Sequence, residues 1–186
     1  ATLLQVARTS FRPEDLQAIK GQPLVYWWDQ AFLHKFLSYP AVRDVARVTK
    51  GICTTNNGRF TRCAWDPAPA DLCVKTFSQK TSDHRWQPFI NGAKGLAWFE
   101  PLLRCIAYSR LGLEVHVQQD YYRIAHPALQ LINTGFYFRA GVAFSMIGSG
   151  FTARAHRFRS IIGNKGSSVF PEDIPGTMEA QIQKAV

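Results

Sequence analysis

The stretch KGICTTNNGRFTR, residues 50–62, is the most informative feature of the sequence. It places four small polar residues between two glycines, Gly51 and Gly58, and then adds two arginines. Glycine permits backbone angles that other residues avoid, and a guanidinium group suits phosphate oxygens or the edge of guanine. The stretch therefore predicts either a loop that lies against a nucleic-acid backbone or an ordinary hairpin turn, which an Asn-Gly pair also favours.

Two later segments repeat this design, and a third places cations beside aromatic residues. Residues 87–95 and 163–168 are polar turns with glycines and one lysine each, and 151–158 alternates aromatic and basic side chains. If this segment is a strand, Arg154 and His156 share one face while Arg157 and Arg159 share the other, and the alternative is that these charges only confer solubility. We expect the three glycine bends to meet in a concave cationic groove that accepts a double helix. The candidate DNA-contacting residues are Thr54, Thr55, Asn56, Asn57, Arg59, Arg62, Asn91, Lys94, Arg154, His156, Arg157 and Lys165.

The composition favours a polyanionic partner. The chain of 186 residues has 22 Lys and Arg against 13 Asp and Glu, a formal net charge of +9, which suits DNA, RNA or an acidic membrane face. No apolar run approaches the roughly 20 residues of a membrane span, and no secretory signal is evident, so we expect a cytoplasmic protein without a membrane partner. The four cysteines form no Cys-x-x-Cys pair and predict reduced thiols rather than a zinc site.

The order of expected elements mixes helices with short strands. Asp29 precedes an apolar stripe at helical spacing and predicts a helix over 30–39. Period-two alternation predicts a strand over 114–118, 133–149 is the clearest β region, and 42–48 fits a strand or a short helix. Further expected elements are strands at 3–6 and 60–65, a strand or helix at 102–109 and a helical turn at 127–132. The pattern predicts an α+β fold with mostly antiparallel short strands and a few helices.

No set of residues predicts catalysis or metal binding. The sequence has neither a P-loop nor a Gly-x-Gly-x-x-Gly fingerprint, and its five histidines are not spaced as metal ligands. A small hydrolase built on His84 or His116 would need partners brought together by the fold. We therefore expect no catalytic residues, no metal site and no cofactor in this chain.

Six blocks, taken in order, resemble a known family. They are IKGQPLVYWW at 19–28, the stretch 51–62, WQPFINGAKG at 86–95, FYFRAGVAFS at 136–145, FTAR at 151–154 and GSSVFP at 166–171. This order resembles the C-terminal half of large adenine-specific DNA methyltransferases of the BREX and DISARM phage-defence systems, and type IIG restriction–modification enzymes are similar. The family block Gly…Thr-x-Asn-x-x-Phe-x-Arg matches Gly51, Thr55, Asn57, Phe60 and Arg62.

The resemblance implies a DNA target-recognition domain over 1–176, followed by a C-terminal helix over 177–186 that leads to the rest of a parent enzyme. One departure matters, because the family's catalytic motif Asn/Asp-Pro-Pro-Tyr/Phe is absent, and Asp66-Pro67-Ala68-Pro69 does not match it. The resemblance therefore implies DNA recognition without catalysis, with S-adenosylmethionine used by the parent enzyme. Since the chain begins without Met, we expect a piece of a larger protein.

Two other classes of function stay open on the sequence. A protein–protein docking module of a defence complex would use exposed tryptophans and other aromatic residues as its anchors. An RNA-binding domain is the other class, although no aromatic RNP-type strand is evident. A contiguous aromatic patch without arginines around it would favour the docking module.

Overall fold

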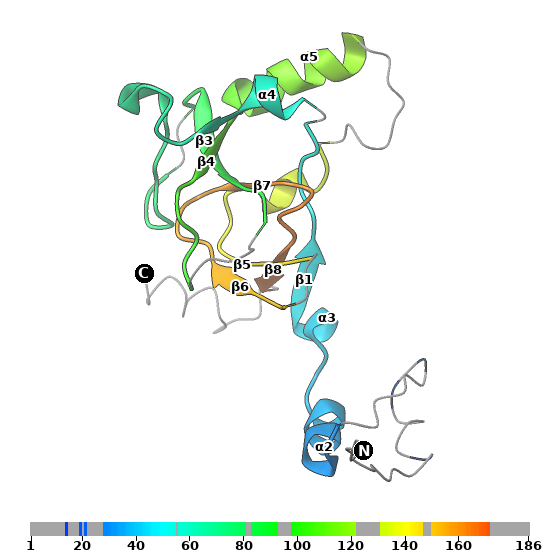
Figure 1. Cartoon of the computed structure of the whole chain (residues 1–186). Helices are drawn as coiled ribbons and strands as arrows, with labels where there is room; N and C mark the ends of the chain where they lie inside the picture. The colour runs from blue at the N-terminus through cyan, green and yellow to red at the C-terminus, as the bar shows by residue number, and fades with distance from the viewer. Residues whose placement is uncertain are drawn as a thin grey trace, which may run out of the picture. The chain divides into compact units, whose positions relative to one another are not determined.

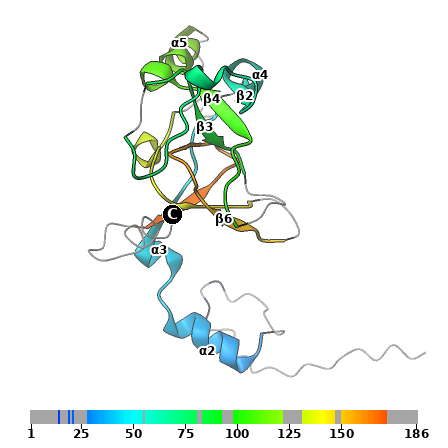
Figure 2. The same cartoon turned by 90° about the vertical axis from the view of Figure 1, so that its left-hand side faces the viewer.

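The computed structural model describes residues 14, 19, 21, 28–54, 56–80, 83–92, 98–121, 131–146 and 150–171. The chain divides into two compact units, Ala1–Val45 and Ala46–Val186 (Figures 1 and 2). The recognition domain predicted over 1–176 includes residues of both units and stays a prediction. The predicted elements at 3–6, 127–132 and 177–186 lie outside the described residues.

The first unit contains the helix that the sequence predicts. Helix α2 runs over Gln30–Ser38, and the Asp29 carboxylate caps it by accepting a hydrogen bond from the backbone N–H of Phe32 at 2.6 Å. The side chain of Leu33 is buried, while Phe32 and Phe36 are about half exposed. The helix and its cap are therefore confirmed, but its apolar stripe is only partly buried within this unit.

The second unit contains two four-stranded sheets built from the described residues (Figure 1). The strands are β1 (Ala46–Thr49), β2 (Thr61–Cys63), β3 (Trp86–Ile90), β4 (Arg104–Ala107), β5 (Val142–Phe144), β6 (Ala153–Ala155), β7 (Ile161–Ile162) and β8 (Ser168–Pro171). One sheet has the order β1-β8-β5-β6, and the other has β2-β4-β3-β7. All pairs are antiparallel except β3 with β7, which confirms the predicted α+β fold of mostly antiparallel short strands.

Helices and turns complete the second unit. They are α4 (Asn57–Phe60), α5 (Leu113–Tyr121), η1 (Pro69–Asp71), η2 (Ser109–Gly112) and η3 (Thr134–Phe136). The short helix α3 (Val42–Val45) ends the first unit, so the segment predicted as a strand or a short helix contains both, α3 and then β1. Figures 1 and 2 both show α4 and α5 at the end of the unit formed by the sheet of β2, β3 and β4.

The core lies mainly along the second sheet. Every residue of β3 is buried, and β4 and β7 pair with this strand on its two sides. Phe60, Ile106, Ile161 and Phe170 are fully buried in the same cluster. Burying an aliphatic or aromatic side chain contributes about 1.5–3 kcal/mol, so this cluster is the main source of stability for the unit.

Two polar loops carry the chain from one sheet to the other. The loop after β1 leads to β2, and the loop after β7 leads to β8. The loops contact each other through their backbones: Gly51 N donates to Gly163 O at 3.2 Å, and Ile52 N donates to Ile162 O at 2.9 Å. A Cβ atom added to Gly51 would lie 1.8 Å from Ile162 O. Glycine is thus required here by the close approach of two backbones rather than by unusual backbone angles.

The strand predicted over 114–118 is wrong, because these residues belong to helix α5. Val115 and Gln118 are buried residues of α5, and their separation of three positions is a helical spacing. Of the β region predicted over 133–149, the described residues 133–146 contain the three-residue strand β5, preceded by the turn η3, and 147–149 lie outside the described residues. Short elements of this kind are set by tertiary packing more than by local pattern.

Substituting Gly51 by Ala is expected to destabilise the protein by about 3 kcal/mol, since the new methyl group would overlap the backbone of Ile162. Gly58→Ala is the matched control, because its Cβ would meet only Asn56 Oδ1 at 3.7 Å. Within α4 that change is expected to leave stability unchanged or to raise it by up to about 1 kcal/mol. Urea unfolding of both variants measures the difference, and equal effects would contradict the close-approach account.

Candidate nucleic-acid interface

The three glycine bends come together in the described part of the chain. Asn164 N donates to Ile52 O at 2.9 Å, and Gly163 N donates to Ile90 O at 2.8 Å. A Cβ on Gly166 would lie 2.3 Å from Ile90 O, so the third bend packs against the end of β3 where the second bend begins. The expected convergence is therefore present, with the third bend between the other two.

The first bend contains one turn of helix rather than a hairpin. The Asn56 side chain caps α4 by accepting a hydrogen bond from Arg59 N at 3.0 Å. Thr54 is buried and its hydroxyl donates to Asn57 Oδ1. Asn56 and Asn57 are exposed, so the bend presents amide side chains on a structured turn.

Arg59 projects from α4 and contacts the neighbouring helix. Its side chain is exposed, and Nη1 donates to Gln118 Oε1 of α5 at 3.3 Å. The guanidinium carbon also lies 5.2 Å from the centre of the Phe60 ring. These contacts restrict the guanidinium group while leaving Nε and Nη2 without hydrogen-bond partners among the described residues.

Arg62 is exposed but serves the local structure. Its Nη1 donates to Gly58 O at 2.6 Å and to Thr61 O at 2.8 Å, so it caps the carbonyl end of α4. The guanidinium carbon lies 5.5 Å from the centre of the Trp86 ring. Arg62 is a predicted DNA contact, and the structure gives it a structural role as well.

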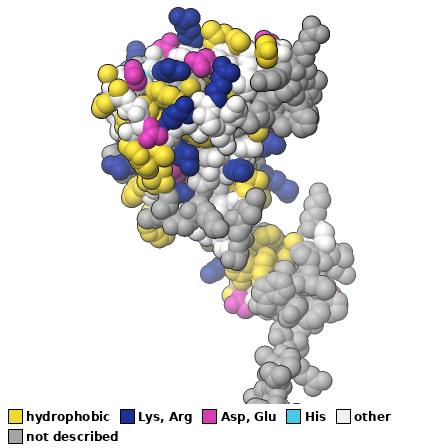
Figure 3. All heavy atoms as spheres, turned by 45° about the horizontal axis from the view of Figure 1, so that its top comes forward, with side chains coloured by type: hydrophobic (Ala, Val, Ile, Leu, Met, Phe, Trp, Pro, Cys, Tyr) yellow, Lys and Arg dark blue, Asp and Glu magenta, His cyan; other side chains and the backbone are white. Residues whose placement is uncertain are grey.

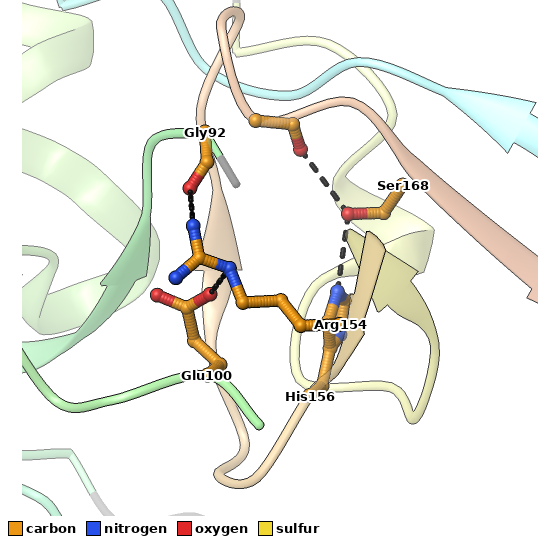
Figure 4. Close-up of polar contacts among 6 residues, drawn as sticks. Gly92, Glu100, Arg154, His156 and Ser168 are labelled. Atoms are coloured by element: carbon orange, nitrogen blue, oxygen red, sulfur yellow. Dashed lines mark hydrogen bonds and ion pairs between the residues drawn. The ribbon is translucent and has the colours of Figure 1, made fainter. Parts of the chain in front are cut away.

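Arg154, predicted as a DNA contact on the surface, is buried instead (Figure 4). Its Nε lies 2.9 Å from a carboxylate oxygen of Glu100, and its Nη2 donates to Gly92 O at 2.7 Å. Burial raises the pKa of the Glu100 carboxyl to about 7, although the charge of Arg154 acts in the opposite direction. The guanidinium group thus forms an internal ion pair and does not belong to an exposed cationic face.

His156 is also buried, and its ring lies beside Ser168 of β8 (Figure 4). Its Nε2 lies 3.1 Å from the Ser168 hydroxyl, and its Nδ1 lies 3.3 Å from Arg139 O. A carbonyl only accepts, so the contact at Nδ1 requires a proton on that nitrogen, while the Ser168 hydroxyl also has Gly166 O as an acceptor at 3.1 Å. Burial lowers the pKa of His156 to about 4, so the ring is neutral at physiological pH and carries no charge for a phosphate.

The other predicted residues fall into two groups. Asn91, Arg157 and Lys165 are exposed, and Arg157 lies over the Phe158 ring at 5.2 Å. Thr55 and Lys94 lie outside the described residues. Figure 3 shows that Lys and Arg side chains on the face with α4 and α5 lie among apolar side chains and several carboxylates. This face is mixed in character and is not a uniformly cationic groove.

The sequence did not reveal which side chains Arg59 and Arg154 contact. Gln118 lies in a segment interpreted as a strand, and its helical spacing from Val115 is the signal that would have placed it beside a core residue. Glu100 sits beside Pro101 in a segment without periodicity, so nothing local marks it as the partner of Arg154. Long-range polar pairs of this kind become visible only in the folded chain.

The described residues also bear on metal binding and on membrane spanning. No group of three or more His, Cys, Asp or Glu side chains in this part of the chain is placed to hold a metal ion. Within the same ranges, no helix has the length and apolar character needed to cross a membrane. All four cysteines are free thiols.

Comparison with known proteins gives one informative similarity. No protein-family model matches the chain. The chain is 25% identical over 161 residues to the adenine-specific methyltransferase BrxX of Escherichia coli O9:H4 (strain HS). The aligned part covers 86% of this chain but 12% of BrxX, so the chain spans about an eighth of that protein's length. The similarity supports the relation to adenine-specific methyltransferases that the six sequence blocks imply.

Replacing His156 by Asn is expected to reduce the loss of unfolding free energy that the protein shows as the pH falls from 6.5 to 4. The unfolded wild-type chain binds a proton at this position near pH 6.5, whereas the folded chain resists protonation until about pH 4. Wild-type stability therefore falls as the pH drops through this window, by at most about 3 kcal/mol, and the variant lacks this loss.

Urea unfolding of both proteins at a series of pH values from 7.5 to 4 measures the difference. The variant His116→Asn, which changes an exposed histidine of α5, serves as the control and should follow the wild-type profile. If His156→Asn and the wild type lose stability in parallel across the window, the account of the buried neutral ring is wrong.

Proposed function

We propose that this chain is a double-stranded DNA recognition module of an adenine-specific DNA methyltransferase of a phage-defence system. The observation that carries the proposal is the similarity to BrxX over 161 residues. The net charge of +9 supports it, because a basic surface favours a polyanionic partner. The chain lacks the family's catalytic motif, so its role is to position the catalytic part of the parent enzyme on DNA.

In this proposal α4 is the element that reads the bases. Arg59 is exposed on it, and an arginine makes a bidentate contact with guanine that is worth about 1–3 kcal/mol of discrimination. Asn57 is also exposed, and because its amide oxygen accepts from Thr54, it offers its NH₂ group to a base acceptor. Gln118 holds one nitrogen of Arg59 and so restricts the guanidinium before DNA arrives, which lowers the entropic cost of binding.

Other exposed cations supply affinity rather than sequence selectivity. Lys165 and Arg157 are exposed and suit phosphate contacts that set the register of the protein on the duplex. The buried Arg154 and His156 are not part of the proposed interface. They stabilise the strands and loops behind it instead.

The remaining steps belong to the parent enzyme. Its catalytic domain would extrude the target adenine from the duplex and would methylate it with S-adenosylmethionine. We place this protein in the cytoplasm, where its DNA partner lies, with other defence-system subunits as further partners.

The affinity of the chain for duplex DNA is expected to fall steeply with salt. Each phosphate contact releases condensed counterions, and six such contacts lower the affinity by about a thousandfold between 50 and 200 mM salt. Fluorescence anisotropy with a labelled duplex from a randomised pool measures the slope. Absence of binding at 50 mM salt, or binding that does not depend on salt, would contradict the proposal.

Arg59→Ala is expected to weaken duplex binding about tenfold or more while changing stability by less than about 0.5 kcal/mol. Arg47→Ala is the matched control, an exposed arginine on β1 outside the proposed interface, and it should change binding by less than threefold. Arg62→Ala should weaken binding but should also cost about 1 kcal/mol of stability, because it removes two hydrogen bonds to backbone carbonyls. Equal effects of Arg59→Ala and Arg47→Ala on duplex binding would show that α4 is not part of the interface.

A second candidate function, protein–protein docking, is favoured by exposed aromatic side chains. Trp98 and Phe151 are about four-fifths exposed. Trp98 O accepts from Ala155 N at 2.9 Å, and Phe151 stacks on Phe144 at 6.2 Å, so both residues lie beside the β5–β6 pair. Such anchors suit a subunit of the same defence complex. If the pair serves a protein partner, the Trp98→Ala, Phe151→Ala double variant keeps wild-type affinity for DNA.

A further inference from the structure

A pocket of about 500 Å³ lies beside α4 and is not explained by duplex recognition. Among the residues that line it, Asn57, Asn91 and Arg104 are exposed, and Phe89, Glu100 and Arg154 are buried. We call the first three the rim and the last three the floor. Ligand pockets of drug-sized or cofactor-sized molecules have volumes of about 300–1,000 Å³, so the size admits a small organic molecule.

The floor offers a hydrogen-bond donor and an acceptor side by side. The Glu100 carboxylate and the Arg154 guanidinium form an ion pair at 2.9 Å. Arg154 uses Nη2 on Gly92 O, but its Nη1 is buried without a hydrogen-bond partner among the described residues. A buried charged donor left unpaired costs free energy that a partner would recover. The floor is therefore suited to a ligand edge that carries an acceptor next to a donor.

The rim has an excess of donors. Arg104 is exposed and makes neither an ion pair nor a side-chain hydrogen bond within the described ranges. Asn57 uses its amide oxygen to accept from Thr54, which leaves its NH₂ group for another acceptor. A cation with neighbouring amide donors suits an anionic group with several oxygens, such as a phosphate.

The apolar side chains of the pocket wall favour a larger ligand over a bare anion. Phe89 and Leu103 contribute apolar surface to the pocket wall, which a phosphate alone would leave uncovered. A nucleobase is planar, presents an aromatic face to such a wall and carries acceptors and donors in alternation along its edges.

We propose that this pocket binds a single nucleotide, with its phosphate at the rim and its base edge against the Glu100–Arg154 pair. Two sources offer the same chemistry, a free nucleoside monophosphate and a nucleotide swung out of a DNA strand. The inference does not depend on duplex recognition, since the pocket is defined by the side chains that line it.

The experiment has one arm for each source. In the first arm, calorimetric titration of the whole chain with each of the four deoxynucleoside monophosphates tests a free ligand. In the second arm, anisotropy compares a perfect duplex with the same duplex carrying a single-nucleotide bulge. Tight binding of at least one monophosphate, or at least tenfold preference for the bulged duplex, is the expected result.

Two variants test whether such binding occurs in the pocket. Arg104→Ala removes the rim cation, and Leu103→Trp fills the pocket from a residue that is 42% exposed and therefore tolerant of a larger side chain. Each should weaken nucleotide binding or the bulge preference at least tenfold, and Arg47→Ala should weaken it less than threefold. Thermal unfolding of each variant verifies that it is folded.

Two outcomes would overturn the inference. One is that neither monophosphates nor the bulge are preferred, and the other is that Leu103→Trp and Arg104→Ala keep wild-type binding. Binding of perfect duplexes alone would overturn the pocket inference while supporting the proposed function. Nucleotide binding that the pocket variants abolish, without any duplex binding, would support the pocket inference and overturn the proposed function.

Discussion

The close approach of Gly51 to the backbone of Ile162 is the constraint on which the second unit depends. Two loops cross between the sheets at this point, and each donates backbone hydrogen bonds to the other. Any side chain at residue 51 would overlap Ile162 O. Because α4 follows within six residues, the position of its exposed amides and arginine is set by the same contact. The surface that we propose for DNA is thus built on a backbone junction.

Basic residues that look alike in the sequence divide into two roles in the structure. Arg154 and His156 are buried and tie β6 to Gly92 and to β8, while Arg59, Arg157 and Lys165 are exposed. Arg62 is exposed and yet bonded to the backbone of its own turn. The net charge therefore overestimates the number of cationic side chains that are available to bind a polyanion. The face in Figure 3, with carboxylates among its cations, agrees with this division.

The sequence predicted the fold class, the helix after Asp29 and the meeting of the three bends, because caps and glycine turns are local signals. It did not predict α5, whose short alternating segment also fits helical spacing around Val115 and Gln118. The burial of Arg154 could not be inferred either, since it depends on Glu100 in a distant loop. The pocket escaped prediction for the same reason, as its lining residues come from separate elements.

Amide hydrogen exchange, followed by mass spectrometry on the free chain and on the chain bound to duplex DNA, tests the central claim most directly. The account predicts that DNA slows exchange in peptides that cover 56–62 and 163–167, where α4 and the neighbouring bend lie together. Peptides from β3 and β4, which form the buried sheet, should exchange at the same rate in both states. Protection confined to segments away from α4 and this bend would contradict the account.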